Sequence, residues 1–145
     1  MGVAKEQNNK GADDFSTALY ATFVEHTLNR IIHLACVSKK TDVKTQSEII
    51  KNINISGKCT WLIKLLNLPP FNTSHIKTIE SISAERNSYI HYKWKPSKDE
   101  ISNHDREKIK INEKLKKIKS LLKYLRTYEA KIEFKGKKTK IVKLV

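Results

Sequence analysis

Apolar residues recur along the chain at the three- and four-residue spacing that marks one face of an α-helix, and this pattern predicts its helices. The first helix is expected to begin after Asp13 or Asp14, either of which can cap it, and to end near residues 38–40. Residues 1–12 are polar and are predicted to be a disordered lead. The apolar positions of the first helix are Phe15, Leu19, Tyr20, Phe23, Val24, Leu28, Ile31, Ile32 and Ala35.

A second helix is predicted to start at Thr45–Glu48, where threonine and glutamate have the spacing of a capping box. Residues 54–57 contain an asparagine and a glycine, which break or bend helices. The sequence therefore leaves open whether 47–67 forms one helix or two. Pro69 and Pro70 end this region.

A third and a fourth helix complete the plan. The third is expected to be capped by Thr73 or Ser74, and the fourth to open at 97–100 with a serine and two acids. The fourth has the apolar stripe Ile111, Leu115, Ile118, Leu122 and Leu125. Residues 132–145 alternate apolar and polar side chains around Gly136, which predicts a basic tail or a short β-hairpin. The expected fold is an all-α, up-and-down helical bundle of four to five helices, with this tail or hairpin at its end.

The composition fits one domain of 145 residues, which is long enough to bury a core. No apolar run approaches the roughly 18 to 20 residues of a membrane span, and Met1–Lys10 has no signal-peptide core. We therefore expect a cytoplasmic protein that does not enter a membrane. Cys36 and Cys59 lie in apolar helical settings without metal-ligand spacing, which predicts buried free thiols and implies no metal and no cofactor.

The positive charge is concentrated in the C-terminal part of the chain. The formal net charge is +14, of which +3 falls on residues 1–92 and +11 on residues 93–145. Such an excess suits a polyanion, and nucleic acid is the first candidate. The alternative is a lysine-rich solvated helix face without a ligand. Only four of the 29 basic residues are arginine, so Arg86 stands out from the other cations.

The stretch 84–94 holds the most informative polar residues. Arg86 continues the stripe of Ile76, Ile79 and Ile82, and a charge on an apolar stripe is costly unless it finds a partner or a water-lined cleft. Asn87 and His91 are four residues apart, so on a helix they lie one above the other. A structural role is the alternative, with Arg86 ion-paired to a nearby acid such as Glu80 or Glu85 and His91 at a helix end.

Arg86 and Asn87, followed by His91, resemble the Arg-x4-6-His motif of HEPN domains, which also favour a polar residue directly after the arginine. Many HEPN domains are metal-independent ribonucleases of toxin–antitoxin, phage-defence and RNA-processing systems. The resemblance implies a HEPN-like helical domain over 13–131 and an endoribonuclease of toxin or phage-defence type. It leaves an antitoxin or another regulatory protein open as a partner. The toxin branch often has tyrosine two residues after the histidine, where this chain has Lys93.

Cutting RNA without a metal needs a base and an acid whose pKa is near neutral, and imidazole has such a pKa. It also needs a cation that stabilises the charge developing on the phosphate, for which the guanidinium group is well shaped. On an ideal helix Arg86 and His91 diverge by about 140°. A two-fold homodimer would bring two of each into one cleft, and the resemblance implies such a composite site. His91 is then the acid and base, Arg86 binds the scissile phosphate, and Asn87 orients His91 or contacts the phosphate.

Further residues are expected to bind the RNA. Aromatic and basic side chains around the motif could shape the cleft or stack a base, although packing is the alternative for the aromatics: Tyr89, Tyr92, Lys93 and Trp94. Lysines of the fourth helix are expected to add RNA affinity without chemistry: Lys116, Lys117, Lys119 and Lys123. The alternative hypothesis for the protein is a non-catalytic helical module that binds nucleic acid or a partner protein.

Overall fold

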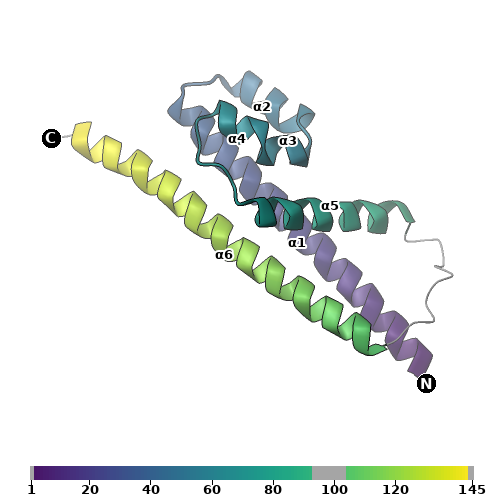
Figure 1. Ribbon diagram of the computed structural model, residues 1–145. Coiled ribbons are helices and arrows are strands. Elements are labelled where there is room, and N and C mark those ends of the chain that lie inside the picture. Colours follow the sequence, from purple (N-terminus) through teal and green to yellow (C-terminus); the bar gives the residue numbers. More distant parts are fainter. Residues whose placement is uncertain (1, 93–103, 144–145) are drawn as a thin grey trace.

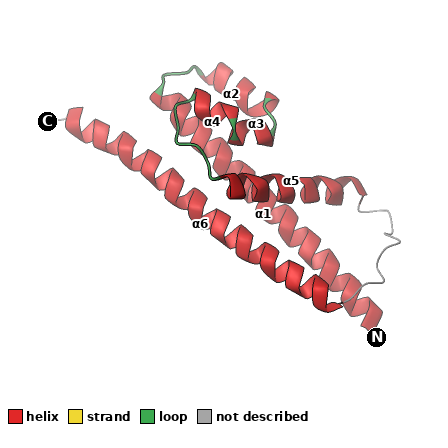
Figure 2. Ribbon diagram, in the orientation of Figure 1, coloured by secondary structure: helices red, strands yellow, loops and turns green. Residues whose placement is uncertain are grey.

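The computed structural model describes the backbone of residues 2–92 and 104–143, and the side-chain surroundings of 13–91 and 109–134. Every regular element in these ranges is a helix, as Figure 2 shows. The expected all-α fold is therefore confirmed. The elements are α1 (Gly2–Ser38), α2 (Val43–Asn52), α3 (Ile55–Cys59), α4 (Trp61–Leu65), α5 (Thr73–Tyr92) and α6 (His104–Lys143).

Asparagine and aspartate side chains start the shorter helices. The Asp42 carboxylate accepts a hydrogen bond from the Thr45 amide at the start of α2, and Asn54 does the same for Gly57 at the start of α3. The Asn72 side chain accepts from the Ser74 amide at the start of α5. The predicted caps at Thr45 and at Thr73 or Ser74 are therefore wrong by one to three residues. The stretch 47–67 forms neither one helix nor two, since it contains parts of α2, α3 and α4.

Three long helices form the body of the molecule (Figure 1). The helices α1 and α6 run in the same direction, and α5 crosses them in the opposite sense. Two ion pairs fix this parallel register, because Lys114 of α6 binds Asp13 near the start of α1 while Glu129 binds Arg30 near its end. The short helices α2, α3 and α4 gather around the C-terminal half of α1.

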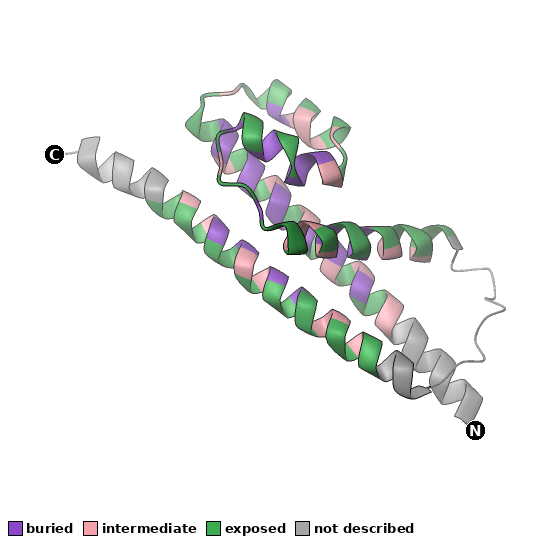
Figure 3. Cartoon of the chain, in the orientation of Figure 1, coloured by how far each residue is buried: buried purple, intermediate pink, exposed green. Residues whose placement is uncertain are grey.

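The core lies where these helices meet. Its larger part takes Val24 and Leu28 from α1 and Ile79 and Ile82 from α5. Cys59 of α3 and Ile63 of α4 belong to it as well. From α6 it takes Ile118, Leu121, Leu125 and Tyr128. A smaller cluster joins the end of α1 to α4 through Ile32, Ala35, Cys36, Leu62 and Leu66. Figure 3 shows these buried positions spaced along α1 and α6 and separated by exposed ones.

Several sequence predictions about the long helices need correction. The helix α1 begins at Gly2, whereas the sequence predicts a disordered lead over 1–12. The C-terminal hairpin is wrong, because α6 continues as one helix to Lys143, through Gly136. One glycine costs a helix only about 1 kcal/mol, so the surrounding helix-forming lysines and glutamates carry the helix across it. The predicted opening of the fourth helix at 97–100 lies outside the described residues. Within the residues that are described, no helix is long and apolar enough to cross a membrane.

Candidate functional site

The C-terminal end of α5 carries the three residues of the predicted catalytic motif. The helix continues to Tyr92, so helical spacing holds through His91. Asn87 and His91 are therefore one turn apart on the same face, and both are exposed. Arg86 is only partly exposed and lies on the neighbouring face, in line with Ile79 and Ile82. The structure thus brings Asn87 and His91 together and turns Arg86 away from them.

Arg86 is held by an acid that the sequence did not single out. Its Nη1 donates to Oε2 of Glu25 on α1 over 2.6 Å, and the two side chains are 17% and 35% exposed. The acids Glu80 and Glu85 are engaged elsewhere: Glu80 accepts from Ser56, and Glu85 binds Lys114. Among the described residues Glu25 is the one partner of Arg86, whose other guanidinium nitrogens make no hydrogen bond there.

Glu25 also balances a second buried cation. Lys58 of α3 is almost fully buried, and its Nζ donates to Oδ1 of Asn29 over 2.8 Å. Burial lowers the pKa of Lys58, and the charge of Glu25 opposes this change. We call Glu25, Asn29, Lys58 and Arg86 the polar cluster. Its two contacts join α1 to α5 through Glu25 and Arg86, and α1 to α3 through Asn29 and Lys58.

The predicted aromatic contributors are described only in part. Tyr89 is half-buried on α5. Tyr92 is the last residue of α5, and its side chain lies outside the described residues, as do Lys93 and Trp94 entirely. Their expected role in stacking a base stays a prediction.

A groove of about 790 Å³ lies between α5 and α6, on a side of α5 away from His91. Lysines from both helices line it: Lys77, Lys110, Lys114, Lys116 and Lys117. Between them stand the hydroxyl groups of Ser74, Thr78, Ser81 and Ser120. Of the α6 lysines predicted to bind RNA, Lys116 and Lys117 border this groove, whereas Lys119 and Lys123 lie on the outer face of α6.

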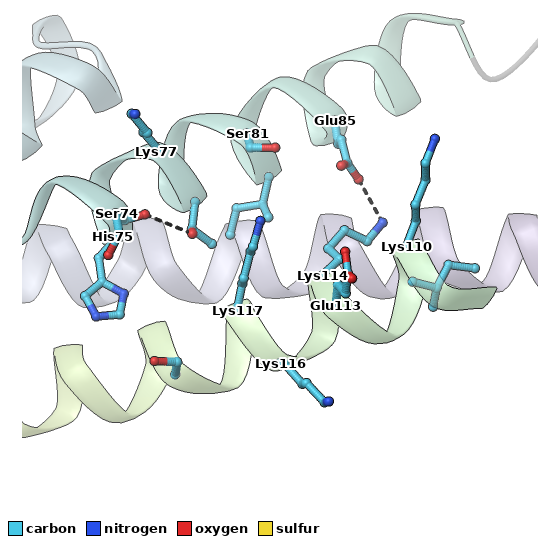
Figure 4. A pocket seen from close by; sticks show the side chains of 14 residues that line it. Ser74, His75, Lys77, Ser81, Glu85, Lys110, Glu113, Lys114, Lys116 and Lys117 are labelled. Carbon is cyan, nitrogen blue, oxygen red and sulfur yellow. Dashed lines mark hydrogen bonds and ion pairs between the residues drawn. The ribbon is translucent and has the colours of Figure 1, made fainter. Parts of the chain in front are cut away.

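One lysine of the groove, Lys114, is already ion-paired with two acids. Lys114 Nζ lies 2.8 Å from Oδ2 of Asp13 and 3.0 Å from Oε2 of Glu85, as the dashed line to Glu85 in Figure 4 indicates. Burial alone would lower the pKa of Lys114, but hydrogen bonds and charges from these two acids outweigh it and raise the pKa. The other groove lysines have no ion-pair partner within the described part of the chain.

Three further histidines and both cysteines lie among the described side chains. His33 shares a 2.8 Å hydrogen bond with Gln46, and His26 is exposed on α1. His75 stacks on Tyr124 at the edge of the groove, and burial lowers its pKa. Cys36 and Cys59 are free and buried, as predicted.

Glu25 and Lys58 were not predicted as site residues, although the sequence contains a signal for each. Glu25 is the only acidic residue between Asp14 and Asp42, inside the apolar pattern of the first helix. Lys58 stands among apolar residues in 55–63. Isolated opposite charges in two apolar segments indicate a buried pair, although their contacts with Arg86 and Asn29 require the fold.

Comparison of the chain with protein-family models, with curated proteins and with solved structures finds no match. The resemblance to HEPN domains stays a prediction that rests on residues 86–91 and the all-helical plan.

Proposed function

We propose that this protein is a metal-independent endoribonuclease of toxin or phage-defence type that acts as a homodimer in the cytoplasm. The observation that carries the proposal is the exposure of Asn87 and His91, one turn apart on a face of α5 that α6 does not cover. An exposed imidazole in this position is within reach of RNA and of a second subunit. The basic surface on α6 supplies a second, independent reason to expect a polyanionic substrate.

In the proposed reaction the RNA supplies its own nucleophile. The 2′-hydroxyl oxygen attacks the adjacent phosphorus, and an imidazole takes its proton. The bond from phosphorus to the 5′-oxygen breaks, and a protonated imidazole donates a proton to that oxygen. The products are a 2′,3′-cyclic phosphate and a free 5′-hydroxyl. One subunit has one His91, so His91 of the partner subunit provides the second imidazole.

The proposal gives Arg86 and Asn87 supporting roles. The Arg86 guanidinium keeps unpaired N–H groups beside its bond to Glu25 within the described part of the chain, and these groups bind the phosphate as charge develops on it. The bond to Glu25 limits the rotation of the Arg86 side chain. The planar guanidinium group therefore has a fixed orientation, which a lysine ammonium group would not have. Asn87 orients His91 or contacts the phosphate.

A second candidate function is a non-catalytic RNA-binding module. The ion pair between Arg86 and Glu25 favours it, because a partly buried, paired arginine also fits a purely structural role. In that case the lysines of α6 bind RNA, and nothing is cut.

The experiment that tests the proposal incubates purified protein with total RNA in excess EDTA and sequences the new ends. The proposed mechanism predicts fragments with 2′,3′-cyclic phosphate ends at an unchanged rate after chelation. Cleavage that stops on chelation, or products with a 3′-hydroxyl, would contradict the mechanism. Binding without any fragments would favour the non-catalytic module.

A further inference from the structure

We infer that the groove between α5 and α6 binds the sugar–phosphate backbone of RNA, and that it contributes most of the RNA affinity of the basic surface. The choice of RNA as the ligand rests on the proposed function. The groove itself is a separate feature, since Arg86, Asn87 and His91 do not line it.

The lysines of α6 divide into two sets by their place on the helix. Lys110 and Lys117 are seven residues apart, so they lie along one line of the helix, and both border the groove. Figure 4 shows Lys117 extending from α6 toward α5 while Lys116 points away. Lys119 and Lys123 are exposed on α6 and do not line the groove; Lys119 lies opposite Lys110, and Lys123 lies on the line of Lys116.

Charge in a concave site acts more strongly than the same charge on a convex helix face, because the walls exclude part of the screening water. The acids in the groove lower this charge without cancelling it. Five lysines line the groove against two acids, Glu85, which is bound to Lys114, and Glu113, so the lining keeps a net positive charge.

The hydroxyl groups favour RNA over an acidic protein. Ser81 and Ser120 face the groove from α5 and α6, whereas the hydroxyl groups of Ser74 and Thr78 already donate to Asn72 and to the Ser74 carbonyl. Short hydroxyl side chains interleaved with lysines are typical contacts to phosphate and ribose oxygens. The groove ends near Glu85, about one and two-thirds helical turns before His91 and on a different face of α5, so RNA bound in it makes contacts separate from those of the exposed imidazole.

The test compares two variants with the same change in net charge on the same helix. The groove variant is Lys110→Gln with Lys117→Gln, and its matched control is Lys119→Gln with Lys123→Gln. The probe is a fluorescent 2′-O-methyl oligouridylate of about 12 nucleotides, long enough to neutralise several lysines. It has no free 2′-hydroxyl and cannot be cut by the proposed mechanism. Affinity is measured by anisotropy between about 50 and 200 mM salt.

The groove variant is expected to bind on the order of tenfold more weakly, and its salt slope should fall by about 1.4, or about 0.7 for each phosphate that a lysine no longer neutralises. The control should bind less than about threefold more weakly. Equal effects in the two variants, or none in either, would overturn the inference. Competition by polyglutamate as effective as that by the oligonucleotide would overturn the assignment to RNA in favour of an acidic protein.

A gain-of-affinity variant makes the test independent of any loss of folding. Ser81 is exposed in the groove, and Asn52 is exposed at the end of α2, away from it. Ser81→Lys should tighten binding more than Asn52→Lys, and equal effects would contradict the inference. Because the probe is inert, a failed cleavage assay leaves this result unaffected.

Discussion

Arg86 is the residue on which the structural and the catalytic roles compete. Its bond to Glu25 positions α5 on α1, and its remaining N–H groups are the ones that would bind phosphate. Glu25→Gln and Arg86→Gln both remove this ion pair, and each should lower the free energy of unfolding by about 1 to 2 kcal/mol. The loss should be larger for Glu25→Gln, because the charge of Glu25 also balances buried Lys58.

The two variants should differ in activity. If Arg86 binds the scissile phosphate, Arg86→Gln should lower the cleavage rate by on the order of 10²-fold or more, because the transition state then has one donor fewer. Glu25→Gln keeps that donor and should lower the rate by less than about tenfold. Urea unfolding and initial cleavage rates measure the two effects. Equal losses of activity would assign Arg86 to the structural role alone.

Cys59 gives a prediction about pH. Burial raises the pKa of its thiol to about 12, the charge of Glu80 raises it further, and Lys58 opposes the change. In the unfolded chain the thiol ionises near its ordinary pKa, so above about pH 9 the unfolded state binds fewer protons than the folded state. The stability contributed by the neutral thiol is therefore complete below that pH and is lost as the pH rises.

The Cys59→Ala variant isolates this contribution. Between about pH 9 and 11 the free energy of unfolding of the wild type should fall faster than that of Cys59→Ala, by up to about 1.4 kcal/mol for each pH unit. Denaturant titrations at several pH values measure the difference. Parallel curves for the two proteins would mean that Cys59 ionises in the folded protein as readily as in the unfolded chain.

The burial of the thiols could be predicted from the sequence, whereas the partner of Arg86 could not. Burial follows the apolar period around Cys36 and Cys59, which is a local property. The ion pair joins Glu25 to a residue 61 positions away. Only the crossing of α5 over α1 decides which acid Arg86 meets, so local spacing indicated Glu80 and Glu85 instead.

At the scale of the elements, the helix α1 shows how far hydrophobic periodicity predicts burial. The periodicity predicts that all nine of its apolar positions face the core. Phe15, Leu19 and Phe23 are in fact more than half exposed, because they fall about 120 to 160° around the helix from the buried line through Val24 and Leu28. An apolar stripe wider than one face cannot be buried by α5 and α6 alone, and the short helices cover only the C-terminal half of α1.

Leu28 and Leu19 form a matched pair that tests this assignment. Leu28 is fully buried and Leu19 is 56% exposed on the same helix. Leu28→Ala should destabilise the protein by about 2 to 5 kcal/mol, because it leaves a cavity in the core. Leu19→Ala should change the free energy of unfolding by less than about 1 kcal/mol. Similar losses in thermal or urea unfolding would mean that the outer face of α1 is covered in solution.

The ends of elements were less predictable than their existence. The apolar stripe predicts the fourth helix but not its extension to Lys143, because the sequence 132–145 also alternates as a strand does. Helix propensity decided the outcome there. The caps at Asp42 and Asn72 lie just before the predicted ones, within the usual uncertainty of helix boundaries.

At the scale of the whole molecule, the proposed chemistry requires two chains. The exposed pair Asn87 and His91 belongs to one side of α5, and a two-fold axis beside it would place two imidazoles in one cleft. Light scattering at micromolar concentration should therefore give twice the 16.8 kDa mass of the chain. A protein that stays at 16.8 kDa while it cuts RNA would contradict the composite site.

The most direct measurement is the rate of RNA cleavage by His91→Ala beside His26→Ala. Both variants remove one exposed histidine, from α5 and α1 respectively, so they serve as matched controls for folding and for contaminating ribonucleases. The account predicts a loss of about 10² to 10⁴-fold or more for His91→Ala, because proton transfer is removed, and a wild-type rate for His26→Ala. A folded His91→Ala protein that cuts RNA at the wild-type rate would contradict the account.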